Sequence, residues 1–292
     1  MSHQAPSIQQ SVRGRLHLEF ACDRQQQCTR LVASEQQPPL RIIRAFPLPA
    51  GGTLVHLHNL SGGVLGGDHL DIAIIVGPHS RVQLTSTGAT RLYRSRPDAS
   101  LARQTTTVSI AENALLEYLP DQIIPFAGSR YQQRTRIDLC DNAGLFWWEI
   151  VAAGRSARGE IFAYDLLEID LSIFAGGRPI AIERAKLAPA SRALSSPARL
   201  GPYTCFASFY ICHAGLPSKR WLEIENELRP LVQTLSRPGE IVWGISSLVA
   251  HGLLVRAVSY QSRDISAGLL VFWQAAKRLL YNEDAIPPRK LY

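Results

Sequence analysis

The sequence predicts a mainly β fold, a layered and coiled, β-helix-like stack of many short strands with a few helices in its C-terminal third. Apolar residues alternate with polar ones or form short runs bounded by Gly, Pro, Asn and Asp. The runs recur at intervals of about 8 to 14 residues, as in stacked or sandwiched sheets. Helical spacing appears only after Pro217. The clearest expected strands, in order, are residues 70–76, 82–87, 105–110, 114–119, 132–139, 145–151, 166–174 and 179–187.

The pattern of apolar and polar residues changes near residue 188. Residues 1–188 are expected to form a β-rich core, and residues 189–292 a mixed α/β part packed on the same core as one structural domain. A connection rich in Ser, Pro and Ala spans 190–202. Helices are expected over 217–235, between two prolines, and over 266–281, where an apolar stripe follows Ser266 as the N-cap.

Composition narrows the class of protein. The 292 residues are 46% hydrophobic, enough for a substantial core, and no run approaches the ~20 apolar residues of a membrane span. The polar N-terminal segment does not resemble a secretory signal, and five cysteines without a CxxC pair favour reduced thiols. We therefore expect a cytoplasmic protein without a membrane association.

The positive charge does not predict nucleic-acid binding. The net charge is +7, but only four of the 31 basic residues are lysines and the arginines are scattered without a basic block. RNA-binding modules combine basic residues with aromatic clusters, which are missing here. Arginines suit ion pairs and protein interfaces instead.

Residues 61–68, Ser-Gly-Gly-Val-Leu-Gly-Gly-Asp, form the most distinctive local motif. Gly62, Gly63, Gly66 and Gly67 predict a tight, closely packed turn. A P-loop would need Lys and Ser or Thr after its last glycine, and a dinucleotide fingerprint would need a helix there, whereas Asp68 precedes an expected strand.

Candidate metal ligands flank this motif. His56 and His58, two apart on an expected strand, project from one face, with Asp68 and His69 just after the glycines. Such a set suits Ni²⁺ or Zn²⁺, although His-x-His also arises by chance. Glu149 follows two tryptophans, so its carboxyl either has a pKa raised by burial or faces outward.

Several motifs in fixed order resemble the UreD family of urease accessory proteins, over nearly the whole chain. They are residues 62–68, GGVLGGD; 88–95, GATRLYRS; 116–126, LEYLPDQIIPF; and 148–160, from Trp148-Glu149 through Gly154-Arg155 to Arg158-Gly159-Glu160. Trp243-Gly244 and Phe272-Trp273 also match. The ending at 287–292 departs from the family's more usual Pro-Arg, apolar residue and Trp.

The resemblance implies a non-enzymatic assembly factor that joins UreF and the GTPase UreG in a hetero-oligomer, dimerised through UreF, and docks on apo-urease. It implies an internal polar passage for Ni²⁺, with Asp68, Thr90, Glu149 and Glu183 at the corresponding motif positions. Oxygen groups suit stepwise transfer, so we expect transient Ni²⁺, bound no tighter than about micromolar, and no tightly bound cofactor. We expect the surface for UreF in residues 241–281.

Two other functions remain open. In a β-rich interaction scaffold without a metal role, the same carboxylates would only pair with arginines. In a hydrolase, Asp68 and Glu149 would face each other across a cleft within ~10 Å. No Gly-x-Ser-x-Gly elbow supports nucleophilic catalysis by serine.

Overall fold

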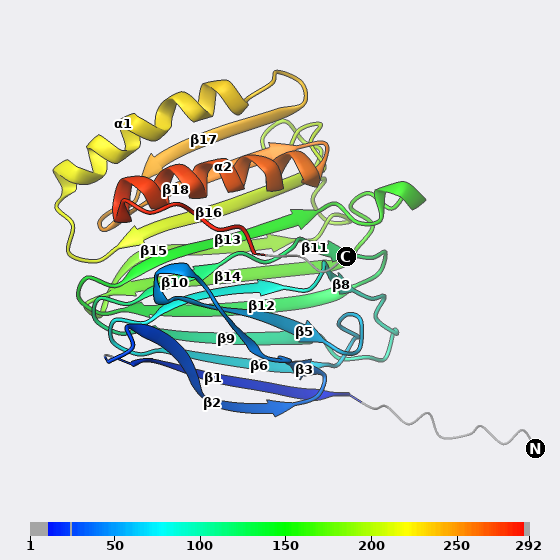
Figure 1. The fold of residues 1–292 in the computed structure, drawn as a ribbon. Helices are drawn as coiled ribbons and strands as arrows, with labels where there is room; N and C mark the ends of the chain where they lie inside the picture. Colours follow the sequence, from blue (N-terminus) through cyan, green and yellow to red (C-terminus); the bar gives the residue numbers. More distant parts are fainter. Residues whose placement is uncertain (1–10, 24, 289–292) are drawn as a thin grey trace, which may run out of the picture.

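The computed structural model describes residues 11–23 and 25–288, and it confirms the mainly β, coiled and layered fold (Figure 1). Two large sheets lie face to face, and two helices cover part of the second sheet. The N-terminal segment up to residue 10 and most of the closing motif, residues 289–292, lie outside the described residues.

The first sheet has seven strands, and its five central strands run parallel. The strands at its two edges are antiparallel to their neighbours. In spatial order the strands are β15 (Arg178–Leu187), β14 (Leu166–Ala175), β12 (Arg130–Leu139), β9 (Ala102–Ile110), β6 (His69–Val76), β1 (Arg13–Asp23) and β2 (Cys28–Gln37).

The second sheet has eleven strands, with a parallel centre and an antiparallel C-terminal side. Its main path is β17 (Ile241–Ser247), β18 (Gly252–Ser259), β16 (Cys205–His213), β13 (Gly144–Ala152), β10 (Leu115–Tyr118), β7 (Arg81–Ser86), β5 (Thr53–Asn59) and β3 (Leu40–Arg41). Off this path, β4 (Ala45–Pro47) pairs with β5, β11 (Ile123–Pro125) with β13, and β8 (Thr90–Leu92) with β11.

The chain coils because it passes repeatedly from one sheet to the other. It runs from β5 to β6, from β8 to β9, from β11 to β12 and from β13 to β14, each time leaving the second sheet for the first. These four turns lie at one edge of the coil, at the right of Figure 1. We call them the turn edge: residues 60–68, 93–101, 126–129 and 153–165, the last including η2 (Ser156–Arg158).

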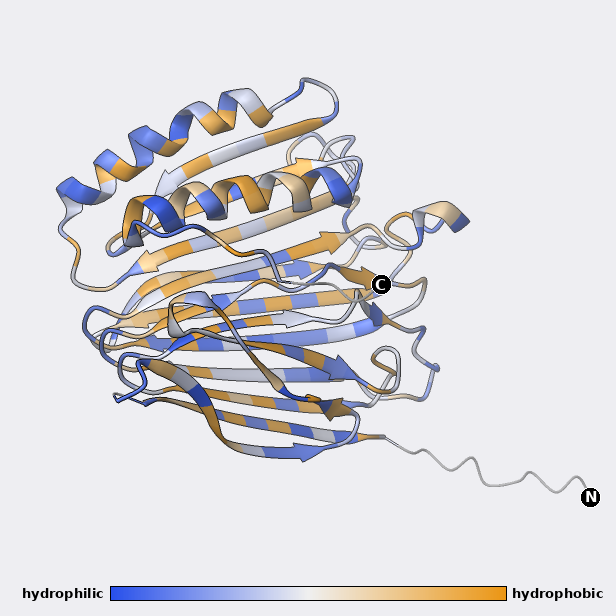
Figure 2. Ribbon diagram, in the orientation of Figure 1, coloured by the Kyte–Doolittle hydropathy of each residue, from blue (hydrophilic) through white to orange (hydrophobic). Residues whose placement is uncertain are grey.

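Alternation along the strands builds two apolar cores. In β13, Leu145, Trp147 and Val151 face the first sheet, whereas Phe146 and Trp148 face the helices. A period of two is what a strand between two layers requires, because successive side chains point to opposite faces. The alternating colours of the strands in Figure 2 follow this pattern.

The helices α1 (Ser218–Leu235) and α2 (Ser262–Tyr281) pack on the outer face of the second sheet. Helix α1 lies where the sequence predicts it. Helix α2 begins four residues before the predicted start at Ser266, so Ser266 is not its N-cap. The Ser266 hydroxyl donates to the Ser262 carbonyl inside the helix, and Asp264 in the first turn favours the earlier start through the helix dipole. Neither helix of the described chain is long and apolar enough to cross a membrane.

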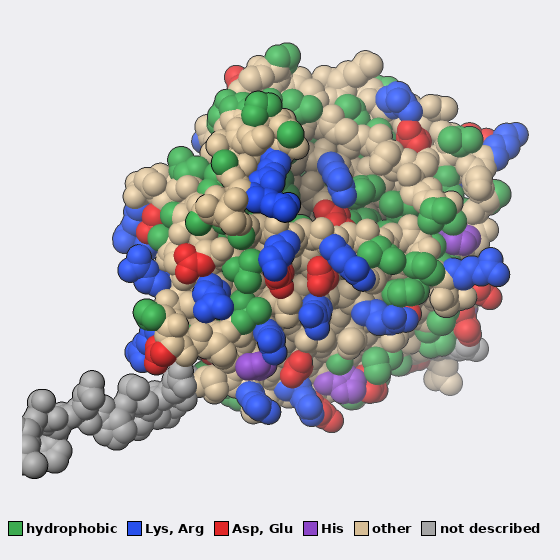
Figure 3. Space-filling model, turned by 180° about the vertical axis from the view of Figure 1, so that it is seen from behind, with side chains coloured by type: hydrophobic (Ala, Val, Ile, Leu, Met, Phe, Trp, Pro, Cys, Tyr) green, Lys and Arg blue, Asp and Glu red, His purple; other side chains and the backbone are tan. Residues whose placement is uncertain are grey.

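The outer face of the first sheet carries charged side chains of both signs. Arg136 and Asp138 form an ion pair at 2.7 Å, and Lys186 and Glu168 one at 3.0 Å. Seen from behind in Figure 3, Lys and Arg side chains stand among Asp and Glu over this face. Exposed pairs contribute less than about 1 kcal/mol each, so they keep the face polar more than they stabilise it.

Candidate functional site

A cavity of about 290 Å³ lies between the two sheets beside the turn edge. Its walls come from β5, β6, β9, β12, β13 and the segment between β7 and β8. The cavity reaches the surface where β7 ends at Ser86 and β8 begins at Thr90, because β8 pairs with β11 and not with β5. The exposed lining residues are Gly62, Thr87, Gly88 and Arg91.

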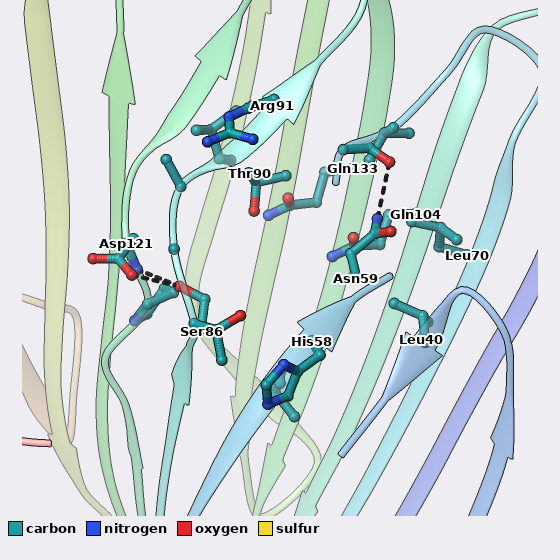
Figure 4. Close-up of a pocket in the computed structure, with 18 of the residues that line it drawn as sticks. Leu40, His58, Asn59, Leu70, Ser86, Thr90, Arg91, Gln104, Asp121 and Gln133 are labelled. Carbon is teal, nitrogen blue, oxygen red and sulfur yellow. Dashed lines mark hydrogen bonds between the residues drawn. The ribbon is translucent and has the colours of Figure 1, made fainter. Parts of the chain in front are cut away.

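Polar side chains line the inner part of the cavity. Gln104 and Gln133 come from the first sheet, while Thr90 and Glu149 come from the second. Figure 4 shows Thr90 and the two glutamine side chains close together, with Asp121 on the other side, where the Ser86 hydroxyl donates to its carboxylate at 3.1 Å. Two of the predicted passage residues, Thr90 and Glu149, therefore share one cavity.

Glu149 faces inward between the sheets. Burial, and then the charge of Glu183, raise the pKa of the Glu149 carboxyl to about 7, although the hydrogen bond that Gln133 Nε2 donates to it opposes this shift. Of the two sequence interpretations, the structure supports the desolvated carboxyl. A carboxyl with such a pKa changes between its neutral and its anionic form near neutral pH.

The raised pKa predicts how the stability of the free protein depends on pH. Between pH 4.5 and about 7 the folded state holds a proton on Glu149 that the unfolded state releases, so the free energy of unfolding falls as the pH rises, by up to ~3 kcal/mol. We expect Glu149→Gln to remove this part of the dependence and to stabilise the protein at pH 8. Urea unfolding at pH 5 and pH 8 measures the change in the free energy of unfolding between these pH values. An equal change in Glu149→Gln and in the unaltered protein would contradict the prediction.

Glu183 lies beyond Glu149, on the edge strand β15, and bridges the two sheets. Its carboxylate accepts hydrogen bonds from the hydroxyls of Tyr210 and of Ser208, the latter at 3.3 Å, and lies 3.3 Å from Arg256 Nη2. Because Glu183 raises the pKa of Glu149, the two carboxylates are electrostatically coupled. Glu183 itself does not line the cavity, and its partner Arg256 is exposed.

Asp68 does not line the cavity. It is buried, and its carboxylate accepts hydrogen bonds from the backbone N–H groups of Leu65 at 2.9 Å and Val12 at 3.2 Å. The first bond closes the glycine turn and the second ties it to the start of β1. Asp68 and Glu149 therefore do not face each other across this cavity, as the hydrolase alternative requires.

The four glycines shape the turn in two ways. Gly62 and Gly67 have φ of +70° and +90°, whereas Gly63 and Gly66 allow close approach. A Cβ on Gly63 would lie 2.5 Å from the Arg91 carbonyl oxygen, and a Cβ on Gly66 would lie 3.0 Å from Ser95 Oγ. The predicted tight, closely packed turn is confirmed, and Gly62 and Gly63 form part of the cavity wall.

Gly63→Ala is expected to destabilise this wall. The added methyl would push the 91–93 segment away and weaken the bond from Val64 N–H to the Arg91 carbonyl, now 2.8 Å long. Overpacking of this kind costs about 1–3 kcal/mol. Urea unfolding measures the loss. Gly88→Ala is the matched control, since its Cβ would meet nothing within 4 Å, and an equal effect of both changes would contradict the expectation.

The histidines do not assemble the expected metal set. His58 lines the cavity, and burial, followed by the charge of His56, lowers its pKa. His56 is buried beside Phe46, with the ring centroids 5.6 Å apart. Within the described chain, no three His, Cys, Asp or Glu side chains come together to hold a metal ion.

Sequence reasoning missed the glutamines of the cavity and the partners of Glu183. The sequence signal that could reveal them is a polar residue at an inward-facing position of a strand in which buried and exposed residues alternate. Gln104 and Thr106 occupy inward positions in the first half of β9, and Tyr131, Gln133 and Thr135 in the first half of β12, whereas the second halves carry apolar residues. One end of the space between the sheets is therefore polar and the other is an apolar core.

Comparisons with known proteins cover almost the entire chain. The family model described as UreD urease accessory protein matches residues 12–291. The urease accessory protein UreD of Herpetosiphon aurantiacus is 45% identical over 279 residues, 96% of each chain. That of Pseudomonas aeruginosa PAO1 is 34% identical over 276 residues, covering 93% of this chain and 92% of the relative. This chain therefore belongs to the UreD family of urease accessory proteins.

Proposed function

We propose that the protein inserts nickel into apo-urease without being a catalyst itself. In this proposal it works in the cytoplasm with UreF and UreG, and Ni²⁺ passes through the cavity between the sheets. The observation that carries the proposal is the cavity itself, in which Thr90 and Glu149 meet two glutamine amides beside the coupled carboxylate of Glu183. The family name supports urease as the recipient.

The chemistry of the lining fits transfer better than storage. Carboxylate, amide and hydroxyl oxygens replace the hydration of a divalent ion one step at a time, and each binds weakly enough to release it. A further polar atom, Thr135 Oγ1, is buried between the sheets and has no hydrogen-bond partner in the described chain. The metal ion is cargo here, and Asp68 contributes by fixing the cavity wall, while its own contact with the ion remains a prediction.

The interaction scaffold is the second candidate, favoured by the ion pair between Glu183 and Arg256. Glu149, however, has no arginine partner within 4.0 Å among the described residues, and the charge that most affects its pKa is that of another carboxylate, Glu183. A group that only stabilised the fold would not be expected in this arrangement, because it costs stability at neutral pH.

For the UreF surface we propose residues 241–281, as the sequence predicts. β17 is an edge strand there, and the side chains of Val242 and Tyr260 are both 43% exposed. Apolar side chains beside an open strand edge are typical of partner surfaces.

Reconstitution tests the proposal. Purified apo-urease is incubated with Ni²⁺, bicarbonate, UreF, UreG and GTP, with and without this protein, and the nickel bound to urease is measured. We expect the nickel content and the urease activity to rise only when the protein is present. Equal activation without it would refute the proposal.

A further inference from the structure

His58 brings an imidazole to the mouth of the cavity. Leu57, the residue before it, pairs with Ser86 at the end of β7 and packs against the core between the sheets. Since successive side chains of a strand point to opposite faces, His58 points to the other face of the second sheet. It still lines the cavity, so its ring lies where the cavity opens through this sheet, beyond the last residues that pair β5 with β7.

The backbone around His58 is fixed and its ring nitrogens are available. His58 pairs with Arg41 of β3, and the Asn59 side chain donates a hydrogen bond of 3.1 Å to the Gly63 carbonyl, which ties the end of β5 to the glycine turn. His58 is half-buried, and no hydrogen bond or ion pair of the described chain involves its ring. His56, two residues earlier, is buried and does not line the cavity.

The neighbours of His58 at the mouth supply oxygen. Ser86 and Asp121 line the same mouth, and Figure 4 shows Ser86 between Asp121 and the His58 ring. The Asp121 carboxylate also offsets the charge of Arg91, which lines the cavity as well. The groups deeper in the cavity are hydroxyl, amide and carboxylate oxygens, so the imidazole joins a set of ligand groups that otherwise consists of oxygen.

Oxygen groups alone do not make a passage selective for nickel. Carboxylate, carbonyl and water oxygens suit Mg²⁺ and Mn²⁺, whereas an imidazole nitrogen favours Ni²⁺, Cu²⁺ and Zn²⁺. Mg²⁺ is a hard cation that takes oxygen ligands and gives up its water reluctantly. Near neutral pH the imidazole of histidine is commonly neutral, and its unprotonated nitrogen can bind a metal ion. One imidazole at the mouth therefore favours the softer ions over Mg²⁺ on entry.

We propose that His58 makes the passage prefer Ni²⁺ to Mg²⁺, by giving the entering ion an imidazole nitrogen beside the oxygens of Ser86 and Asp121. The inference rests on the proposed function and assigns the ion selectivity of that passage to one residue. The ligand is transient, because no three His, Cys, Asp or Glu side chains of the described chain come together to retain the ion. Zn²⁺ and Cu²⁺ share the preference for imidazole, so His58 discriminates against hard ions only.

Metal titration of the full chain tests this assignment. The affinities for Ni²⁺ and for Mg²⁺ are measured by calorimetry, and their ratio is the readout, since a merely structural role would change both affinities together. We expect His58→Asn to bind Ni²⁺ at least fivefold more weakly, with its affinity for Mg²⁺ unchanged. His58→Asp should bind Mg²⁺ more tightly and lose most of the preference for Ni²⁺, because a carboxylate replaces the nitrogen with oxygen.

His79→Asn is the matched control. His79 is exposed in the turn between β6 and β7, away from the cavity, and its φ of +61° is one that asparagine tolerates. Both affinities should stay unchanged in this variant. Nuclear magnetic resonance gives a second readout, because paramagnetic Ni²⁺ should broaden most strongly the histidine ring signal that is missing from His58→Asn. Far-UV circular dichroism verifies that each variant folds.

Three outcomes would overturn the inference: an unchanged ratio of the two affinities in His58→Asp, an equal loss of nickel affinity in His58→Asn and His79→Asn, or no measurable binding of Ni²⁺ by the unaltered protein. Reconstitution distinguishes such a failure from that of the proposed function. If the protein raises the nickel content of apo-urease but the ratio does not depend on His58, only the selectivity is assigned wrongly. If it does not raise the nickel content, the proposed function fails.

Discussion

Replacing Thr90 with tryptophan is expected to leave the protein bound to apo-urease while lowering the nickel that reaches the enzyme at least tenfold. Thr90 lines the cavity next to its mouth and is half-buried. An indole there would fill much of a space of about 290 Å³ and block the passage of a hydrated or partly hydrated ion. Complex formation should persist because Thr90 is half-buried and the exposed side chains of the protein are unchanged.

Glu149→Gln tests the same passage by charge and not by size. The amide keeps an oxygen that can accept the hydrogen bond from Gln133, but it removes the carboxylate that would coordinate the ion. We expect a several-fold loss of urease nickel content with normal complex formation. The free energy of unfolding at pH 8 should not fall, because burial disfavours the charged form of the carboxyl that the amide replaces.

Controls on the outer face of the first sheet separate a blocked passage from a general disturbance. Thr107→Trp places the same indole on an exposed position of β9, and Glu168→Gln removes a carboxylate outside the cavity. Both should support full activation. Nickel content by mass spectrometry and pull-down of the complex give the two readouts, and full activation by the Thr90→Trp, Glu149→Gln double variant would exclude this passage.

The fold could be predicted largely from the sequence, because alternation and turn residues act locally. The strand of residues 70–76 and the helix of residues 217–235 appear where their patterns indicate, as β6 and α1. The predicted start of α2 is wrong, since residues 262–265 give no strong helix signal. The order of strands in each sheet depends on contacts far apart in the chain, which no local pattern encodes.

The candidate site was predictable only in part, for the same reason. Resemblance placed Thr90 and Glu149 in a passage, but it could not show that Gln104 and Gln133 complete the cavity wall from the opposite sheet. Nor could it show that the Asp68 carboxylate holds the backbone of the glycine turn. Inward-facing polar positions become meaningful only when the register between strands is known.

Glu117 illustrates a motif residue whose structural role sequence did not reveal. It lies in residues 116–126, one of the motifs in which the sequence resembles the family, but it faces α2 on the outer side of the second sheet. Its carboxylate lies 3.0 Å from Lys277 Nζ and accepts a hydrogen bond of 2.9 Å from Trp273 Nε1. The side chains of Glu117 and Lys277 are 5% and 10% exposed, so this is a buried ion pair that fixes α2 on the sheet.

Glu117→Gln is therefore expected to lower the free energy of unfolding by about 3–5 kcal/mol, because it leaves the Lys277 ammonium buried without a counter-charge. Lys277→Met should cost a similar amount by stranding the carboxylate. The double variant should lose less than either single one, since the introduced amide would still accept the hydrogen bond from Trp273 and no buried charge would remain. Urea unfolding of all four proteins gives the coupling free energy.

Arg278→Gln is the matched control for this cycle. Arg278, also on α2, pairs with Asp284 at 3.2 Å, but the two side chains are 73% and 87% exposed, so its loss should change the free energy of unfolding by less than about 1 kcal/mol. If the losses of the two single variants simply added in the double variant, Glu117 and Lys277 would not be coupled. The packing of α2 would then depend on its apolar side chains, such as Phe272 and Leu269, and not on the buried ion pair.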